Sequence, residues 1–224
     1  MNPPSSEARS HRRLSAIIFD MDGTLVDSTR AVTTAYIDTV RDLGGPGYRP
    51  QDVVDAYSLG PPGTILAHLL RRPCSPGDIA AYHRQLVRSA VHVTVYPGIR
   101  QALQELARGT VLAVFTGASE AAADIILRNA GLRDFFRVVV GGDGVSRPKP
   151  HPEGVLRVCA LLDTDVARVA YVGDSPLDLA CARSSGALAV AAAWGHLYDR
   201  AAPADVVVAE PGQLPARLAG GDAS

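Results

Sequence analysis

Lysine is almost absent from this sequence, which has 22 basic residues but only one lysine, Lys149. A strong charge of one sign is also missing, because the formal net charge of the 224 residues is −1 and no basic stretch stands out. Nucleic acids and anionic membranes bind strongly basic surfaces, so the sequence predicts neither as a partner. No apolar run is long enough to cross a bilayer as a helix.

Cysteine is scarce as well. Cys74, Cys159 and Cys181 are an odd number without the spacing of a metal site. We interpret them as reduced thiols, which predicts a cytoplasmic protein. Residues 1–13 are polar and lack the apolar core of a secretory signal, so we expect a flexible tail there.

What the sequence does contain is a regular series of short apolar runs, at residues 14–19, 111–115, 138–140, 169–172, 188–193 and 206–208. Such runs are typical of parallel strands that are covered on both faces. Segments with helical spacing lie between them, at residues 99–106, 121–130 and 177–184. This alternation predicts an α/β fold with a Rossmann-like, doubly wound parallel sheet. Ligands of such sheets bind beyond the C-terminal ends of the strands.

Residues 28–95 break this rhythm. They contain helical patches at 65–70 and 79–87 and turn clusters at 44–47 and 61–63, with little strand signal. We therefore expect an inserted α-helical cap over 28–95, with the core formed by residues 14–27 and 96–218.

The first predicted strand ends in Asp20-Met21-Asp22-Gly23. Two carboxylates so close at a strand end repel each other, and a divalent cation such as Mg²⁺ relieves that repulsion. One carboxylate can then attack phosphorus while the other transfers a proton, and Gly23 allows a tight turn beside the substrate. The structural alternatives are an Asx turn before a helix and the start of a calcium loop.

The second strand ends in Thr116-Gly117, a small hydroxyl followed by glycine at an expected helix start. This pair could offer O–H and N–H donors to a phosphate, or Thr116 could be a plain helix N-cap. Lys149 lies between Pro148 and Pro150, which restrict its position. Its compact ammonium could offset the charge of Asp20 and of a phosphoryl group, although a rigid surface turn would also explain the sequence.

A further strand ends in Gly173-Asp174-Ser175-Pro176, with Asp178 one helical turn later. Asp174 and Asp178 could face one cation. Acidic residues in the first turn of a helix are also common because they complement the helix dipole. Each motif thus has a structural explanation, but four strand ends that carry polar groups suited to one site favour a shared function.

The segments DMDGTLVDS, FTGAS, RPKPHP and VGDSPLDLACA, taken together, resemble the haloacid dehalogenase-like hydrolase superfamily. The resemblance is to phosphatases similar to phosphoglycolate phosphatase and to the β-phosphoglucomutase group, and it extends over residues 14–214. It implies a Rossmann-like core with a helical cap, and a Mg²⁺-dependent phosphatase that acts on a small phosphorylated metabolite as a monomer or homodimer.

The resemblance also implies a role for each matching residue. Asp20 would be the nucleophile and a metal ligand, and Asp22 the general acid/base with its carbonyl near the metal. Asp174 would ligate Mg²⁺, supported by Ser175 and Asp178. The phosphate would be bound by Gly23, Thr116, Gly117 and Lys149.

Two departures concern the substrate. Gly117 stands where a side-chain donor is common, which predicts a change in substrate fit. Arg30 and the segment Leu59-Gly60-Pro61-Pro62 differ from the sugar-phosphate mutases, whereas Thr24 is similar to phosphatases. We expect the substrate contacts of the cap among a set of polar and apolar candidates, namely Tyr57, Leu59, His68, Arg71, Arg72 and His83.

Two alternatives remain open at this stage. A phosphomutase would return the phosphoryl group to a bound bisphosphate, and it would turn over substrate without releasing phosphate. A catalytically silent binding module on the same fold would be expected to lack at least one of Asp20, Asp22, Lys149 and Asp174, and all four are present.

Overall fold

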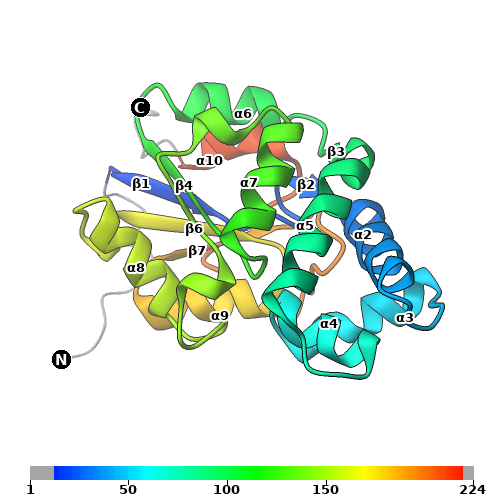
Figure 1. The fold of residues 1–224 in the computed structure, drawn as a ribbon. Helices are drawn as coiled ribbons and strands as arrows, with labels where there is room; N and C mark the ends of the chain where they lie inside the picture. The colour runs from blue at the N-terminus through cyan, green and yellow to red at the C-terminus, as the bar shows by residue number, and fades with distance from the viewer. Residues whose placement is uncertain (1–12, 219–224) are drawn as a thin grey trace.

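The computed structural model describes residues 13–218, so the predicted tail lies outside the described residues except for Arg13. A six-stranded sheet runs through the centre of the molecule (Figure 1), in the strand order β5-β4-β1-β6-β7-β8. The strands are β1 (Ala16–Phe19), β4 (Val111–Phe115), β5 (Val138–Val140), β6 (Val169–Gly173), β7 (Leu188–Ala192) and β8 (Val206–Val208). All neighbours pair in parallel, which confirms the predicted doubly wound α/β fold.

Helices cover both faces of this sheet (Figure 1). One face carries α6 (Ile99–Leu106), α7 (Glu120–Asn129) and α10 (Leu214–Leu218), and the other carries α8 (Glu153–Leu161) and α9 (Pro176–Ser185). Both faces of strand β1 are buried, which explains why its sequence is apolar throughout. Ile17 and Phe19 join the core cluster on the α6–α7 side, and Ala16 and Ile18 join the cluster on the α8–α9 side, since successive strand side chains point to opposite faces.

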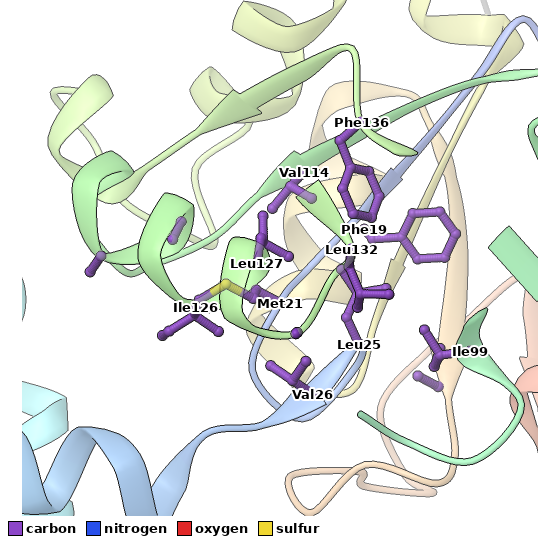
Figure 2. Close-up of a cluster of buried hydrophobic side chains, with 14 of the residues drawn as sticks. Phe19, Met21, Leu25, Val26, Ile99, Val114, Ile126, Leu127, Leu132 and Phe136 are labelled. Atoms are coloured by element: carbon purple, nitrogen blue, oxygen red, sulfur yellow. The ribbon is translucent and has the colours of Figure 1, made fainter. Parts of the chain in front are cut away.

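Figure 2 shows the first of these clusters, where side chains of the sheet meet those of α7. Phe19 and Phe136 pack edge to face with their ring centroids 6.2 Å apart, and Leu127 and Leu132 are fully buried beside them. The burial of each such side chain contributes about 1.5–3 kcal/mol to the stability of the fold. The cluster fixes α7 against the sheet and thereby fixes the loop that leads from β4 into α7.

The segment between the first and second strands of the sheet is helical, as predicted. Its helices are α2 (Thr29–Asp42), α3 (Pro50–Asp55), α4 (Pro62–Leu70) and α5 (Pro76–Ser89). Short 3₁₀ helices complete the chain at η1 (Ala56–Leu59), η2 (Ala90–His92), η3 (Arg133–Phe135), η4 (Gly142–Gly144), η5 (Val166–Arg168) and η6 (Pro211–Gln213).

The helical segment begins and ends at a small antiparallel pair that the sequence did not predict. Strand β2 (Val26–Asp27) pairs with β3 (Thr94–Val95), so the chain leaves and rejoins the core at neighbouring points. Two residues per strand are too few to produce a visible alternation of apolar and polar residues, which is why the pair was missed.

The start of α5 is held by a capping box, in which Ser75 and Asp78 bond reciprocally to each other's backbone N–H. Arg72 adds a bidentate ion pair to Asp78, with Nη–Oδ distances of 2.7 and 2.9 Å. The interior of the helical segment contains Tyr36 and Tyr82, whose rings stack with centroids 4.4 Å apart. Within residues 13–218, no helix combines the length and the apolar character needed to span a membrane.

The close approach of α8 to β4 gives a test of this packing. A Cβ atom on Gly154 would lie 2.0 Å from Cζ of the buried Phe115. We therefore expect Gly154→Ala to lower the free energy of unfolding by about 1–3 kcal/mol, as overpacking does, in urea titrations monitored by circular dichroism.

Gly63→Ala is the matched control, because Gly63 is also the second residue of its helix, α4, and its added Cβ would meet only Ile79 Cδ1 at 3.7 Å. It should leave the stability unchanged or raise it by up to about 1 kcal/mol. Equal effects of the two substitutions would contradict the packing described for α8.

Candidate active site

The site lies at the switch point of the sheet, where β1 and β6 are neighbours and the chain connections diverge to either side. Asp20 follows β1 directly, and its backbone N–H donates to the carbonyl of Val172 in β6 at 2.8 Å. Asp174 follows β6, and Thr116 follows β4. Parallel pairing therefore brings these three side chains to the same edge, as the sequence predicted.

Lys149 is the centre of this group. Its ammonium donates to Asp20 Oδ1 at 2.6 Å and to Asp178 Oδ1 at 2.7 Å, although the three residues come from three separate parts of the chain. The side chains are 11%, 9% and 2% exposed for Lys149, Asp20 and Asp178. Lys149 does lie in a turn between the exposed Pro148 and Pro150, as a structural explanation would have it, but its side chain points inward and bridges two carboxylates.

The surroundings of Lys149 keep it charged. Its ammonium lies 5.2 Å from the ring centroid of Phe115 and 5.5 Å from that of Tyr171, which are cation–π distances. Burial by itself would lower the pKa of Lys149, but the attraction of Asp178 and Asp20 outweighs it, and the pKa is raised. The ammonium is therefore permanently protonated at physiological pH.

Burial has the opposite consequence for Asp20. The pKa of Asp20 is raised well above its usual value, mainly by burial, and Lys149 only partly offsets this. The neighbouring carboxylates of Asp178 and Asp22 raise it further. A second cation beside Asp20 would reverse this shift, because it would stabilise the ionised form.

Asp22 directly precedes Gly23, where the chain makes a tight turn. Gly23 has a φ of +83°, and a Cβ on it would lie 2.3 Å from Asp174 Oδ2, so a side chain would not fit here. The Ser28 hydroxyl donates to Asp22 Oδ1. Burial raises the pKa of Asp22, whereas this hydrogen bond from Ser28 lowers it.

Asp174 is 1% exposed and only half satisfied. Its Oδ2 accepts a hydrogen bond from the backbone N–H of Leu197 at 2.9 Å. Its buried Oδ1 has no hydrogen-bond partner among the described residues. Because an unpaired buried oxygen is costly, this atom is a position where a ligand would be stabilising.

Both carboxylate oxygens of Asp178, in contrast, already accept hydrogen bonds. Its two oxygens accept from Lys149, from the Tyr171 hydroxyl at 3.0 Å, and from the backbone and hydroxyl of Ser175 at 3.0 and 2.6 Å. Ser175 and Asp178 also form the capping box of α9, which confirms the helix-cap interpretation, and both line the cavity. Burial alone would raise the pKa of Asp178, but these donors lower it.

The carboxylates fit a hard divalent cation. Asp20, Asp174 and Asp178 each place one oxygen within 4.8 Å of the others, and all three are buried. With Asp22, four aspartates line the same cavity as the one ammonium, and the free Oδ1 of Asp174 is available as a ligand. Oxygen donors of this kind are those that Mg²⁺ and Ca²⁺ prefer.

Thr116 and Gly117 line the same cavity, but the prediction that Thr116 stands at a helix start is wrong. Helix α7 begins at Glu120 and its N-cap is Ser119, whose hydroxyl accepts from Ala122 N at 3.3 Å. Thr116 is buried in the preceding loop and accepts from Ala118 N at 3.2 Å. A Cβ on Gly117 would meet no atom within 4 Å, so neighbouring atoms do not require glycine there.

Most of the proposed cap contacts are not at the site. The cavity has a volume of about 470 Å³, and of the six candidates only Tyr57 lines it. Leu59, His68 and Arg71 are exposed elsewhere, and Arg72 binds Asp78. His83 instead places Nε2 3.4 Å from Ser119 Oγ. Arg30 and Thr24 do not line the cavity either.

Several residues at the site were missed by the sequence analysis. Ser28 and Tyr171 contact Asp22 and Asp178, and the loop after β7 contributes His196 and Leu197 to the cavity wall. The last two could have been found, because the rule that ligands gather beyond the C-terminal strand ends applies to the strand at 188–193 as well.

Comparison with known proteins decides the family. The model of the haloacid dehalogenase-like hydrolase family matches residues 17–192, which is most of the chain. This chain belongs to that family. The matched range begins in β1, ends at the last residue of β7, and includes every aspartate described above as well as Lys149.

Relatives within this hydrolase family are named as phosphatases. The chain is 36% identical to the probable phosphatase IndB of Dickeya dadantii over 203 residues, covering 86% of this chain and 88% of that protein. It is 32% identical to the plasmid-encoded phosphoglycolate phosphatase of Cupriavidus necator over 213 residues, covering 91% and 92%. These likenesses confirm the prediction that the chain is an enzyme with phosphatase activity.

The fold has close solved counterparts. CbbY from Rhodobacter sphaeroides, solved in complex with phosphate, superposes with a TM-score of 0.78 over 92% of this chain and 99% of that one, at 24% identity. At this level of identity the likeness shows the fold, and it confirms the predicted Rossmann-like architecture.

The raised pKa values predict how stability depends on pH and metal. Burial raises the pKa of Asp20, Asp22 and Asp174. A carboxyl with a raised folded-state pKa contributes stability at low pH that is lost as pH rises through that pKa. In EDTA, the thermal midpoint should therefore fall between about pH 5 and about pH 8, while Asp178, whose pKa is lowered, stays ionised throughout.

Addition of MgCl₂ at the upper pH should raise the midpoint, because a ligand of the folded state stabilises it. Asp174→Asn serves as the control, since it removes one buried charge and should weaken both the pH dependence and the effect of MgCl₂ in differential scanning fluorimetry. A wild-type midpoint that does not respond to EDTA or to MgCl₂ would contradict this description of the site.

Proposed function

We propose that this protein is a Mg²⁺-dependent phosphatase that hydrolyses small phosphate monoesters through an aspartyl-phosphate intermediate on Asp20. The observation that carries the proposal is the environment of Asp20. It lies at the tip of β1 in the wall of a cavity, its carboxylate is held by Lys149 at 2.6 Å, and Asp22 and Asp174 line the same cavity. An oriented carboxylate beside a cation is suited to nucleophilic attack on phosphorus.

The residues that would hold the metal are Asp20, Asp174 and the backbone carbonyl of Asp22, with Ser175 and Asp178 in support. When bound, the cation neutralises the phosphoryl oxygens and the crowded carboxylates. Asp178 is assigned a supporting role because its oxygens already accept from Lys149, Tyr171 and Ser175.

In the first half-reaction, an oxygen of Asp20 forms a bond to phosphorus and the bond from phosphorus to the alcohol oxygen breaks. Asp22 gives its proton to that leaving oxygen. Lys149 offsets the negative charge on the transferring group, and the Thr116 hydroxyl and the backbone N–H of Gly117 hold its oxygens. The predicted role of Gly23 is confined to the tight turn beside the site, because its backbone N–H already donates to the carbonyl of Val26 at 2.9 Å. Positioning and charge stabilisation supply most of the rate in such transfers.

In the second half-reaction, Asp22 takes a proton from a water molecule that attacks the phosphorus of the aspartyl phosphate. The bond to Asp20 breaks, phosphate is released and both carboxyl groups return to their starting states. The raised pKa of Asp22 suits this double use, because the group must be protonated in one step and ionised in the next.

We also propose the compartment, the class of substrate and the oligomeric state. Cys74, Cys159 and Cys181 form no disulfide, which supports work in the reducing cytoplasm. The substrate is a small phosphorylated metabolite, since named relatives such as phosphoglycolate phosphatase act on molecules of that kind. We further propose that the protein is a monomer or a homodimer.

Replacement of the nucleophile tests the mechanism. Asp20→Asn should lower kcat by about 10⁴-fold or more, because an amide does not form the phosphoenzyme. Phosphate release is measured with MgCl₂ and again after EDTA treatment. Asp134→Asn is the control, since Asp134 is an exposed aspartate outside the cavity. Full activity of Asp20→Asn, or wild-type activity that survives EDTA, would refute the mechanism.

The hydrogen bond from Ser28 gives a second test. It lowers the pKa of Asp22, so Ser28→Ala should raise that pKa. Because Asp22 must be protonated to act on the leaving oxygen, the alkaline limb of kcat/KM should move to higher pH. Ser184→Ala, which removes an exposed hydroxyl of α9, should leave the profile in place. A shift toward lower pH would exclude Asp22 as the acid.

A further inference from the structure

The cavity has two chemically different parts. Its carboxylate end has been described above. The other part is lined by the helical segment and by α7. Apart from Thr29 at the start of α2, it consists mainly of aromatic and aliphatic side chains, namely Val32, Tyr36, Tyr57, Ile65, Tyr82 and Ile126. The group that leaves with the alcohol oxygen must occupy this second part, because the phosphoryl group occupies the first.

Three of these residues form an aromatic cluster. The rings of Tyr36 and Tyr82 stack with centroids 4.4 Å apart, and Tyr57 lies tilted at 6.5 Å from Tyr36. Tyr57 keeps 36% of its surface exposed, so part of its ring is available to a ligand. Burial raises the pKa of all three hydroxyls, which keeps them neutral. Tyr36 and Tyr82 are each only 2% exposed, so Tyr57 is the ring that offers flat, uncharged surface, and its packing on Tyr36 holds it in place.

Cations are missing from this part of the cavity. Within residues 13–218, Lys149 is the one lysine or arginine that lines the cavity, and it is already bound to Asp20 and Asp178. His196 is a further basic side chain in the wall, and it lies near Asp22 and Asp174, at the carboxylate end. Arg72 of the helical segment is bound to Asp78.

This distribution of charge disfavours substrates whose leaving group is anionic. The carboxylate of phosphoglycolate, or the second phosphate of a bisphosphate, would enter the apolar part of the cavity, where no lysine or arginine of residues 13–218 lines the wall. There it would lose its hydration without gaining a partner, which is strongly unfavourable. A sugar would bring hydroxyls against Val32, Ile65 and Ile126, which offer them no hydrogen bonds.

An apolar ring fits the same surroundings well. The volume of about 470 Å³ lies within the range of about 300–1,000 Å³ in which pockets hold ligands larger than a two-carbon acid. Leu177 and Leu197 also line the cavity and are 52% and 54% exposed, so its rim is apolar as well. Exposed apolar side chains gathered at a cavity are typical of a binding site.

We propose that the leaving group of the substrate is an uncharged, flat aromatic alcohol, bound against Tyr57 of the tyrosine cluster and against the aliphatic side chains beside it. The proposal rests on the phosphatase function proposed above and specifies its substrate class. It separates this enzyme from relatives whose names denote an anionic substrate, such as phosphoglycolate phosphatase.

A panel of esters tests the proposal. Benzyl phosphate, 2-naphthylmethyl phosphate, phosphoglycolate and glucose 6-phosphate are all monoesters of primary alcohols, so their P–O bonds have similar intrinsic reactivity. With MgCl₂, kcat/KM for the two aromatic esters should exceed that for the other two by at least about tenfold. Equal or better turnover of phosphoglycolate or glucose 6-phosphate would overturn the proposal and leave the phosphatase function standing.

Equilibrium binding gives a readout that is independent of turnover. 2-Phenylethylphosphonate and 3-phosphonopropionate are the methylene analogues of benzyl phosphate and phosphoglycolate, and neither can be hydrolysed at that position. Calorimetry with the wild-type protein and MgCl₂ should show a dissociation constant at least about tenfold lower for the aromatic analogue. The reverse order would overturn the proposal. Absence of metal-dependent hydrolysis across the whole panel would overturn both this proposal and the phosphatase function.

A single substitution should change the preference. Val32 is half-buried on α2 in the apolar part of the cavity. Val32→Lys adds the missing cation and should raise the ratio of kcat/KM for phosphoglycolate to that for benzyl phosphate by about tenfold or more. Val32→Gln, of similar length but uncharged, should not. The same ratio in both variants would contradict the charge argument, and the wild-type panel remains decisive if either variant folds poorly.

Discussion

The contact of one ammonium with two buried carboxylates is the interaction on which the rest of the site depends. Lys149 binds Asp20 and Asp178 at 2.6 and 2.7 Å, and the burial of its ammonium is balanced by these two carboxylates. Loss of one partner from a buried pair costs about 3–5 kcal/mol, because the other charge is left uncompensated. The geometry of Asp20, the cap of α9 and the loop that carries Lys149 are therefore coupled through this contact.

The sheet provides the constraint that makes the contact possible. Asp20, Thr116 and Asp174 follow β1, β4 and β6, and parallel pairing brings the ends of these strands to one edge. The covered faces of the sheet hold the strand positions through side chains such as Phe19 and Phe115. Close packing then leaves room for a charged cluster only at the open strand ends, where backbone groups are also available as donors.

The sequence was sufficient for the parts that follow local rules. Apolar runs located the six strands, and the polar residues at their ends located Asp20 and Asp174. Lys149 is not at a strand end, since it lies nine residues beyond the end of β5; it was found because it is the one lysine of the sequence. It was not sufficient where tertiary packing determines which side chains reach the cavity. Which faces of the helices between β2 and β3 turn toward the cavity depends on how these helices cross. Of the candidates from the sequence, Tyr57 lines the cavity, whereas Arg72 binds Asp78 instead. The sequence analysis missed Tyr36 and Tyr82, which also line the cavity.

The paired strands β2 and β3 connect the helical segment to the sheet at two adjacent points. No strand of the central sheet is formed by residues between them, so its strand order does not depend on what lies in that interval. Mutations in α2 to α5 can accordingly reshape the wall that faces the leaving group while Asp20, Lys149 and Asp174 keep their positions. An architecture of this kind lets selectivity diverge among descendants of one ancestor while the reactive centre is inherited intact.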